Sequence, residues 1–210
     1  MSHSSNPYPL FVGPRSASDG VSMGSLRGNR TGEQVVSLNH GRYAEASGRG
    51  KIFMAQAIVT APVIWTTEAG TGGPLLWNGS SSVVCNILAV GLGQSVAATV
   101  AGALGLTGGY GQTAAPTSTT AIDSQSCLYL DTSTPQASVY RVGTTGTNRF
   151  FIPFASVGTG ALTVVETTLH WIDLGGIVTV PQNGFVSIAA SATLTTGVFD
   201  MALVWEEIPV

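Results

Sequence analysis

The end of the chain shows a regular pattern of apolar segments separated by turn residues. Ile177–Val180 is an apolar, β-branched run, and Pro181–Gly184 is a turn sequence, because proline fixes one backbone angle and Asn-Gly tolerates positive φ. Phe185–Ser191 alternates its side chains between two faces, and Val198–Trp205, after a turn at Thr195–Gly197, is again apolar. A long apolar strand at a sheet edge invites aggregation, so we expect the last strand to be central.

Similar short segments recur upstream, at the spacing of about eight to twelve residues that is typical of β-sandwiches and jelly rolls. We predict a loop at Thr113–Ser126 and no amphipathic helix. The upstream strands are expected at Ile52–Trp65 (interrupted near Pro62), Leu75–Asn78, Val83–Val90, Cys127–Leu130, Ala137–Val142, Arg149–Phe154 and Ala161–Ile172. The sequence therefore predicts an all-β protein, a jelly-roll-like antiparallel β-sandwich over residues 52–210.

The glycine-rich segment Gly91–Gln112 has three interpretations. A transmembrane helix fits the uncharged length of Val83–Leu106, but the span holds polar residues and several glycines and lacks basic flanks. A phosphate-binding loop fits Gly91-Leu92-Gly93, but the acidic residue that the dinucleotide fingerprint requires is not at the right distance. We favour a β-strand at Val96–Leu106, with glycines where neighbouring chains approach closely.

Residues 1–51, here called the N-terminal arm, differ from the rest of the chain. They are rich in Ser, Gly and Asn, and we expect an extended segment with one short strand at Glu33–His40. The arm has a net charge of +3, whereas residues 52–210 have a net charge of −6, which indicates an arm that docks on an acidic partner. The candidate docking residues are Arg15, Arg27, Arg30, Arg42 and Arg49. They are not interleaved with stacking aromatic residues, so docking on protein is favoured over nucleic acid.

Two features of the composition are informative, the low content of charged residues and the presence of only two cysteines. Charged residues are only 9% of the chain, against about a quarter in ordinary proteins, and a surface with so little charge is commonly covered by other subunits. We therefore expect a homo-oligomer, with neither a membrane nor a nucleic acid as partner. Cys85 and Cys127 are expected to be reduced and buried, because each lies in an apolar predicted strand and no secretory signal is evident.

No pattern of residues indicates catalysis. The histidines His3, His40 and His170 are isolated, and we interpret His170 as a structural residue at the rim of the sandwich. The adjacent pair Glu206 and Glu207 should point to opposite faces of a strand, so the two carboxylates cannot flank one glycosidic bond. The four tryptophans, Trp65, Trp77, Trp171 and Trp205, are assigned to core packing rather than to a sugar-binding platform. We expect no catalytic, cofactor-binding or metal-binding residues.

Two parts of the sequence resemble small virion proteins of tailed bacteriophages. They are the region from His170 onward, with IVTVPQNGFVSIAA and the terminal VWEEIPV, and the strand pair LLWNGSSSVVCNILAV at Leu75–Val90. The resemblance covers about half of the chain and implies a jelly-roll structural protein. Head decoration (cement) proteins are one such class; they are often trimeric and sit where capsid subunits meet.

From the resemblance and the composition we expect a capsid decoration protein that binds the major capsid protein through its arm. Its expected location is the capsid surface of a virion made in the host cytoplasm, and the resemblance alone implies that its assembly is a homotrimer. The first alternative is a tail or fibre-adaptor protein that binds a receptor or glycan. The second is a carbohydrate-active enzyme that uses Asp173, Asp200 and Glu206.

Overall fold

The structure is a computed structural model, and it describes residues 46–47, 49–62, 64–66, 73–128, 132–144, 147–157 and 170–210. These residues are nearly all β, apart from a helical turn at Ala46–Ser47. The eleven strands of the described part are β1 (Ile52–Thr60), β2 (Leu75–Asn78), β3 (Val83–Val96), β4 (Gly102–Gly109), β5 (Thr117–Ala121), β6 (Gln125–Ser126), β7 (Ser138–Thr144), β8 (Phe150–Val157), β9 (His170–Val180), β10 (Gly184–Ala190) and β11 (Val198–Pro209).

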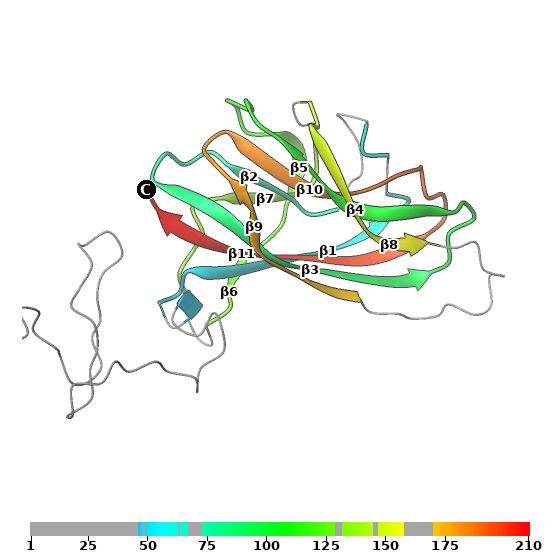
Figure 1. Ribbon diagram of the computed structural model, residues 1–210, viewed down its shortest axis with the longest axis horizontal. Helices are drawn as coiled ribbons and strands as arrows, with labels where there is room; N and C mark the ends of the chain where they lie inside the picture. Colours follow the sequence, from blue (N-terminus) through cyan, green and yellow to red (C-terminus); the bar gives the residue numbers. More distant parts are fainter. Residues whose placement is uncertain are drawn as a thin grey trace, which may run out of the picture.

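The strands form two antiparallel sheets that pack against each other (Figure 1). One sheet has five strands in the order β6-β1-β11-β3-β9, and the other has six in the order β5-β7-β2-β10-β4-β8. The last strand, β11, lies between β1 and β3, which confirms the prediction that it is central. This position gives β11 a hydrogen-bonded neighbour on both sides.

The pairing of strands follows one simple rule. Setting aside β5, β6 and β7, the first strand pairs with the last (β1 with β11), the second with the second-last (β2 with β10), and so on through β3 with β9 and β4 with β8. A long antiparallel ribbon rolled up in this way puts β1-β11-β3-β9 in one sheet and β2-β10-β4-β8 in the other, which is a jelly roll. The predicted fold class is therefore confirmed.

Strands β5, β6 and β7 are an insertion between the fourth and fifth strands of this roll. β6 adds to the edge of the five-stranded sheet beside β1, and β7 and β5 extend the six-stranded sheet beside β2. The insertion therefore widens both sheets on the same side. The predicted loop at Thr113–Ser126 is wrong in this respect, since it contains β5 and β6, and Cys127 lies just beyond β6 rather than inside a strand.

The core lies between the sheets and is built from every second residue of each long strand. β1 alternates almost without exception, with Phe53, Ala55, Ala57 and Val59 buried. The rings of Phe53 and Trp205, on the paired strands β1 and β11, pack together in the core with their centroids 5.9 Å apart. Removing these side chains from water supplies the main drive for packing the two sheets.

Two polar turns fasten one end of the sandwich. The buried Asn78 donates from Nδ2 to the carbonyl oxygens of Val83 (2.9 Å) and Val180 (3.1 Å) and accepts from the Ser80 N–H (3.1 Å). Its own carbonyl accepts a bond from the Asn183 N–H, where φ is 60° in the predicted turn after Pro181. The turn at Pro181–Gly184 was predicted, and Asn78 joins it to the turn after β2 across about a hundred residues of sequence.

The glycine-rich segment resolves into two strands. β3 continues from Val83 to Val96, and β4 begins at Gly102, so the strand interpretation is right in kind but its predicted bounds, Val96–Leu106, are wrong. The described residues contain no helix long and apolar enough to cross a membrane. A side chain on Gly91 or Gly105 would meet an aromatic ring of this same chain, Trp171 or Phe151, which accounts for these glycines without a second chain.

Candidate interaction surface

The outer side of the six-stranded sheet, here called the covered face, is closed by the chain itself. Alternate residues of β10 point inward to the core and outward. The outward-pointing residues, Phe185, Ser187 and Ala189, are nevertheless buried like the inward-pointing ones. Trp65, from the connection between β1 and β2, stacks on Phe151 with ring centroids 5.8 Å apart. These contacts leave this side of the sandwich little apolar surface to offer a partner.

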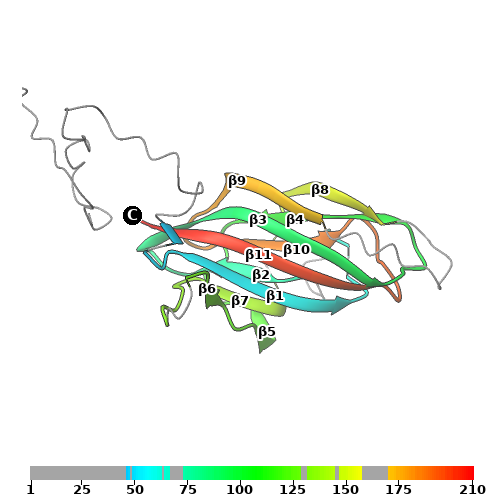
Figure 2. The same ribbon diagram turned by 90° about the horizontal axis from the view of Figure 1, so that it is seen from below.

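The outer side of the five-stranded sheet, here called the bare face, is different. Figure 2 looks onto it, with β1, β11, β3 and β9 side by side. Four large apolar side chains point outward from its two flanking strands: Met54 (36% exposed) and Ile58 (53%) on β1, and Trp171 (57%) and Ile177 (80%) on β9.

The middle of the bare face is flat in one row, where its two central residues, Ala202 and Gly91, are small. Strand register sets Gln56, Ala202, Gly91 and Trp171 in one row across the sheet. A methyl group on Gly91 would stand 3.0 Å from a ring carbon of Trp171, so the indole lies directly against the glycine. A flat apolar surface with an aromatic ring at one side is suited to contact with another polypeptide or a sugar.

The charge of the bare face has one sign. Asp173 on β9 and Asp200 and Glu206 on β11 point outward, and no lysine or arginine occurs in β1, β3, β9 or β11. The Asp173 carboxylate also accepts a bond from the Gly175 N–H at 2.8 Å, at the glycine bulge in β9. The face is therefore apolar and acidic.

The only predicted docking arginine within the described residues is Arg49. It is exposed and lies in a turn that leads into β1, where the Gly50 N–H bonds to the Ser47 carbonyl and the Lys51 N–H to the Ala46 carbonyl. These two hydrogen bonds, with Gly50 at φ 64°, end the helical turn. Arg15, Arg27, Arg30 and Arg42 lie outside the described residues, as does the predicted strand at Glu33–His40.

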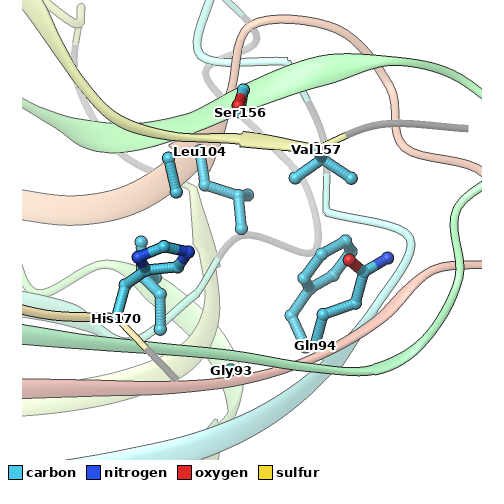
Figure 3. Close-up of a pocket in the computed structure, with 9 residues that line it drawn as sticks. Gly93, Gln94, Leu104, Ser156, Val157 and His170 are labelled. Atoms are coloured by element: carbon cyan, nitrogen blue, oxygen red, sulfur yellow. The ribbon is translucent and has the colours of Figure 1, made fainter. Parts of the chain in front are cut away.

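A small hollow opens between the two sheets at the edge formed by β8 and β9. It has a volume of about 30 Å³, and Gln94, Ser156 and His170 are its polar residues (Figure 3). That volume holds one or two water molecules, and a sugar ring or nucleotide base is far larger. His170 does lie at the rim of the sandwich, but it is exposed.

No protein-family model, curated protein or solved structure matches this chain. Its surfaces have to be interpreted from their own chemistry. Within the part of the chain that the structure describes, no three His, Cys, Asp or Glu side chains are grouped so that they could hold a metal ion.

The adjacent carboxylates at the end of β11 separate as predicted. Glu206 points to the bare face, whereas Glu207 points inward and is buried. Its two oxygens accept bonds of 2.9 to 3.0 Å from the backbone N–H groups of Gln136 and Ala137. The buried carboxylate thus holds the segment before β7, and the two glutamates serve separate parts of the molecule.

The two cysteines are free, but only one is buried. Cys85 is in the core, and desolvation, followed by the nearby Glu207 charge, raises the pKa of its thiol well above the ordinary value. Cys127 is exposed, so the prediction that it is buried is wrong. The reason is that β6 ends at Ser126, which leaves Cys127 outside the apolar strand in which the sequence placed it.

Sequence reasoning missed the apolar residues of the bare face. Trp171 was assigned to the core and is instead exposed, while Trp205 is the tryptophan at the centre of the core. A signal was present in β1, where Met54 and Ile58 occupy the positions that alternation reserves for polar residues. Apolar residues on both faces of a strand at the side of a sandwich indicate a second contact surface.

Proposed function

We propose that this protein is a structural subunit of a virion, a head decoration protein that binds the capsid through its N-terminal arm. The observation that carries the proposal is the jelly roll with one covered face and one apolar, acidic bare face. Jelly rolls are common in viral capsid proteins, although the fold alone does not assign a function. The bare face adds what an assembling subunit needs, a flat contact area without a deep pocket.

The arginines of the arm are the proposed contacts to the capsid or to a neighbouring subunit. Arginine forms forked bonds to carboxylates and carbonyl groups, so an extended arm with several arginines makes many directional contacts. Ordering such a segment costs on the order of 1–2 kcal/mol per residue in backbone entropy, and many contacts have to offset this cost. The low charge content of the chain supports an assembled protein, with a homotrimer as the proposed state.

A second candidate function is favoured by Trp171. An exposed indole that lies flat on a glycine resembles the aromatic platforms on which sugar rings stack, and Asp173 and Asp200 on the same face supply hydrogen-bond acceptors. This arrangement suits a tail or fibre-adaptor protein that binds a glycan. Catalysis on a glycan is the weaker option, because these carboxylates lie on an open sheet surface.

The number of copies per purified particle separates these functions. A decoration protein is expected in a fixed ratio to the major capsid protein, which quantitative mass spectrometry of purified virions measures. A tail or adaptor protein would be present in tens of copies at most. A particle without this protein would overturn the virion proposal altogether.

The role of the arm is tested by deleting residues 2–45 and measuring binding to particles that lack the protein. The structure places the whole described core within residues 52–210, so we expect the shortened protein to fold and to lose binding. Circular dichroism checks folding. Binding of the folded, shortened protein at the wild-type level would show that the sandwich makes the attachment.

A further inference from the structure

We propose that the bare face is the docking surface for residues 1–45 of this protein. The inference goes beyond the capsid binding proposed above, because it concerns the free protein, in which no capsid competes for the arm. It names the surface that receives the arm, the outer side of β1, β11, β3 and β9. Apolar contact, charge and the length of the arm each support this docking.

The bare face has apolar side chains that need cover. Ile58 stands on one side of Ala202, and the Trp171 indole, which covers Gly91, stands on the other, so an extended chain would fit along β11 between them. The first 45 residues contain matching apolar runs, Tyr8–Val12 and Val35-Val36. An extended segment brings such side chains down onto a sheet at every second residue.

The charge of the bare face favours the arm as its occupant over a second copy of the same face. Two bare faces pressed together would bring Asp200 and Glu206 of one copy near the acidic residues of the other, which is unfavourable. The four long strands contain no lysine or arginine, whereas residues 1–45 contain four of the eight in the chain and three acids, which gives a net charge of +1. Residues 1–45 therefore bring arginines to a face whose own strands contain none.

The arm is long enough and leaves the sandwich at the right place. The Lys51 carbonyl accepts a bond from the Glu207 N–H at 2.9 Å, so the arm joins the body at the end of β11, at the border of the bare face. An extended segment of 45 residues spans up to about 150 Å, whereas the twelve-residue β11 is about 40 Å long. The arm is able to cover the bare face of its own subunit or of a neighbour.

Limited trypsin digestion of the full-length protein tests this inference. The arm offers cleavage sites at Arg15, Arg27, Arg30 and Arg42. Cleavage follows the undocked fraction when docking and release are fast, so weakening the docking should speed it. Two single substitutions weaken the face, Asp200→Asn by removing a charge and Ile58→Thr by removing apolar contact while keeping a β-branched residue.

The matched control is Asp123→Asn, which removes one exposed acid outside the bare face. We expect arm cleavage roughly two- to fivefold faster in Asp200→Asn and in Ile58→Thr, and unchanged in Asp123→Asn, because one exposed ion pair contributes little. Cleavage at Arg141 and Arg149, which lie in the sandwich, must stay at the wild-type rate and so reports any unfolding.

Equal cleavage of the arm in all four proteins would overturn the inference. So would a change in sedimentation without a change in cleavage, which would assign the face to a second copy. A loss of binding to a glycan array in Ile58→Thr, with arm cleavage unchanged, would assign the face to a sugar. Because the digestion uses free protein, its failure leaves the copy number in particles to decide the virion proposal separately.

Discussion

The two outer faces of the sandwich follow the same strand geometry but differ in cover. On the covered face the outward-pointing Phe185 is 1% exposed, whereas on the bare face the outward-pointing Ile58 is 53% exposed. The chain closes the covered face itself, with Trp65 stacked on Phe151. It leaves the bare face apolar and acidic. The described residues leave this apolar surface uncovered, and large exposed apolar patches are typical of interaction sites.

The covered face should be the one on which stability depends. We expect Phe185→Ala to lower the free energy of unfolding by about 3–5 kcal/mol, because a large buried ring is removed and a cavity remains. Ile58→Thr on the bare face should change it by less than about 0.5 kcal/mol. Urea unfolding followed by fluorescence measures both. Equal losses in the two variants would mean that the faces do not differ in this way.

Adding one methyl group to a glycine on each face compares their stabilities again. Gly105 lies on the covered face and Gly91 on the bare face. In Gly105→Ala the new Cβ would collide with the Ile152 backbone carbonyl and the Phe151 ring, and a backbone atom has little room to shift. We expect a loss of about 3 kcal/mol. In Gly91→Ala the neighbour at 3.0 Å is the ring of Trp171, a side chain rather than backbone, so the loss should stay below about 1 kcal/mol. Thermal unfolding of both variants checks the order.

Glu207 lies on the inner side of the five-stranded sheet and Glu206 on the bare face, so one substitution at each compares the two sides. Glu207→Gln places an amide donor where Oε2 now accepts from the Gln136 N–H, while Oε1 still accepts from the Gln136 and Ala137 N–H groups, so we expect a loss of about 2 kcal/mol. Glu206→Gln should cost less than about 0.5 kcal/mol. The same unfolding assay applies, and a reversed order would contradict the assignment of the two side chains.

Alkaline pH tests the buried thiol of Cys85. Its pKa is raised in the folded protein, so above the pKa of about 8.5 in the unfolded chain the unfolded state has lost a proton that the folded state keeps. This contribution to stability is complete below pH 8.5 and falls by about 1.4 kcal/mol per pH unit above it.

The matched variant for this prediction is Cys85→Ala, which should lack that part of the pH slope. Other groups titrate in both proteins and cancel in the difference between their unfolding curves. A thiol reagent applied to the native protein should label the exposed Cys127 and leave Cys85 unlabelled. Identical pH slopes, or labelling of both cysteines, would show that Cys85 is not held in the core.

Local sequence signals were sufficient for the strands and turns that depend on near neighbours. The turn at Pro181–Gly184 follows from proline and Asn-Gly, and the strand Leu75–Asn78 was predicted with its bounds. The alternation of β10 was also correct, but the burial of both its faces was not predictable. On the outer side, strand pairing brings the Phe151 ring against Gly105, which is the partner of Ala189 on the neighbouring strand.

The candidate surface could be predicted only in part. The charge contrast between the arm and the body is a property of the sequence, but the position of Asp200 beside Gly93 and Ile58 is set by strand register. The exposure of Trp171 likewise depends on β9 being an edge strand. Cys127 was misplaced because a two-residue strand such as β6 has no periodicity to detect.

Hydroxyl-radical footprinting of full-length protein tests most directly whether residues 1–45 cover the bare face. We expect Trp171 to be oxidised slowly in the wild type and faster in Asp200→Asn with Glu206→Gln, while Tyr110, which is 67% exposed and lies outside the bare face, is oxidised equally in both. Oxidation of Trp171 at the same high rate in the two proteins would contradict the account, because the bare face would then be open whatever its charge.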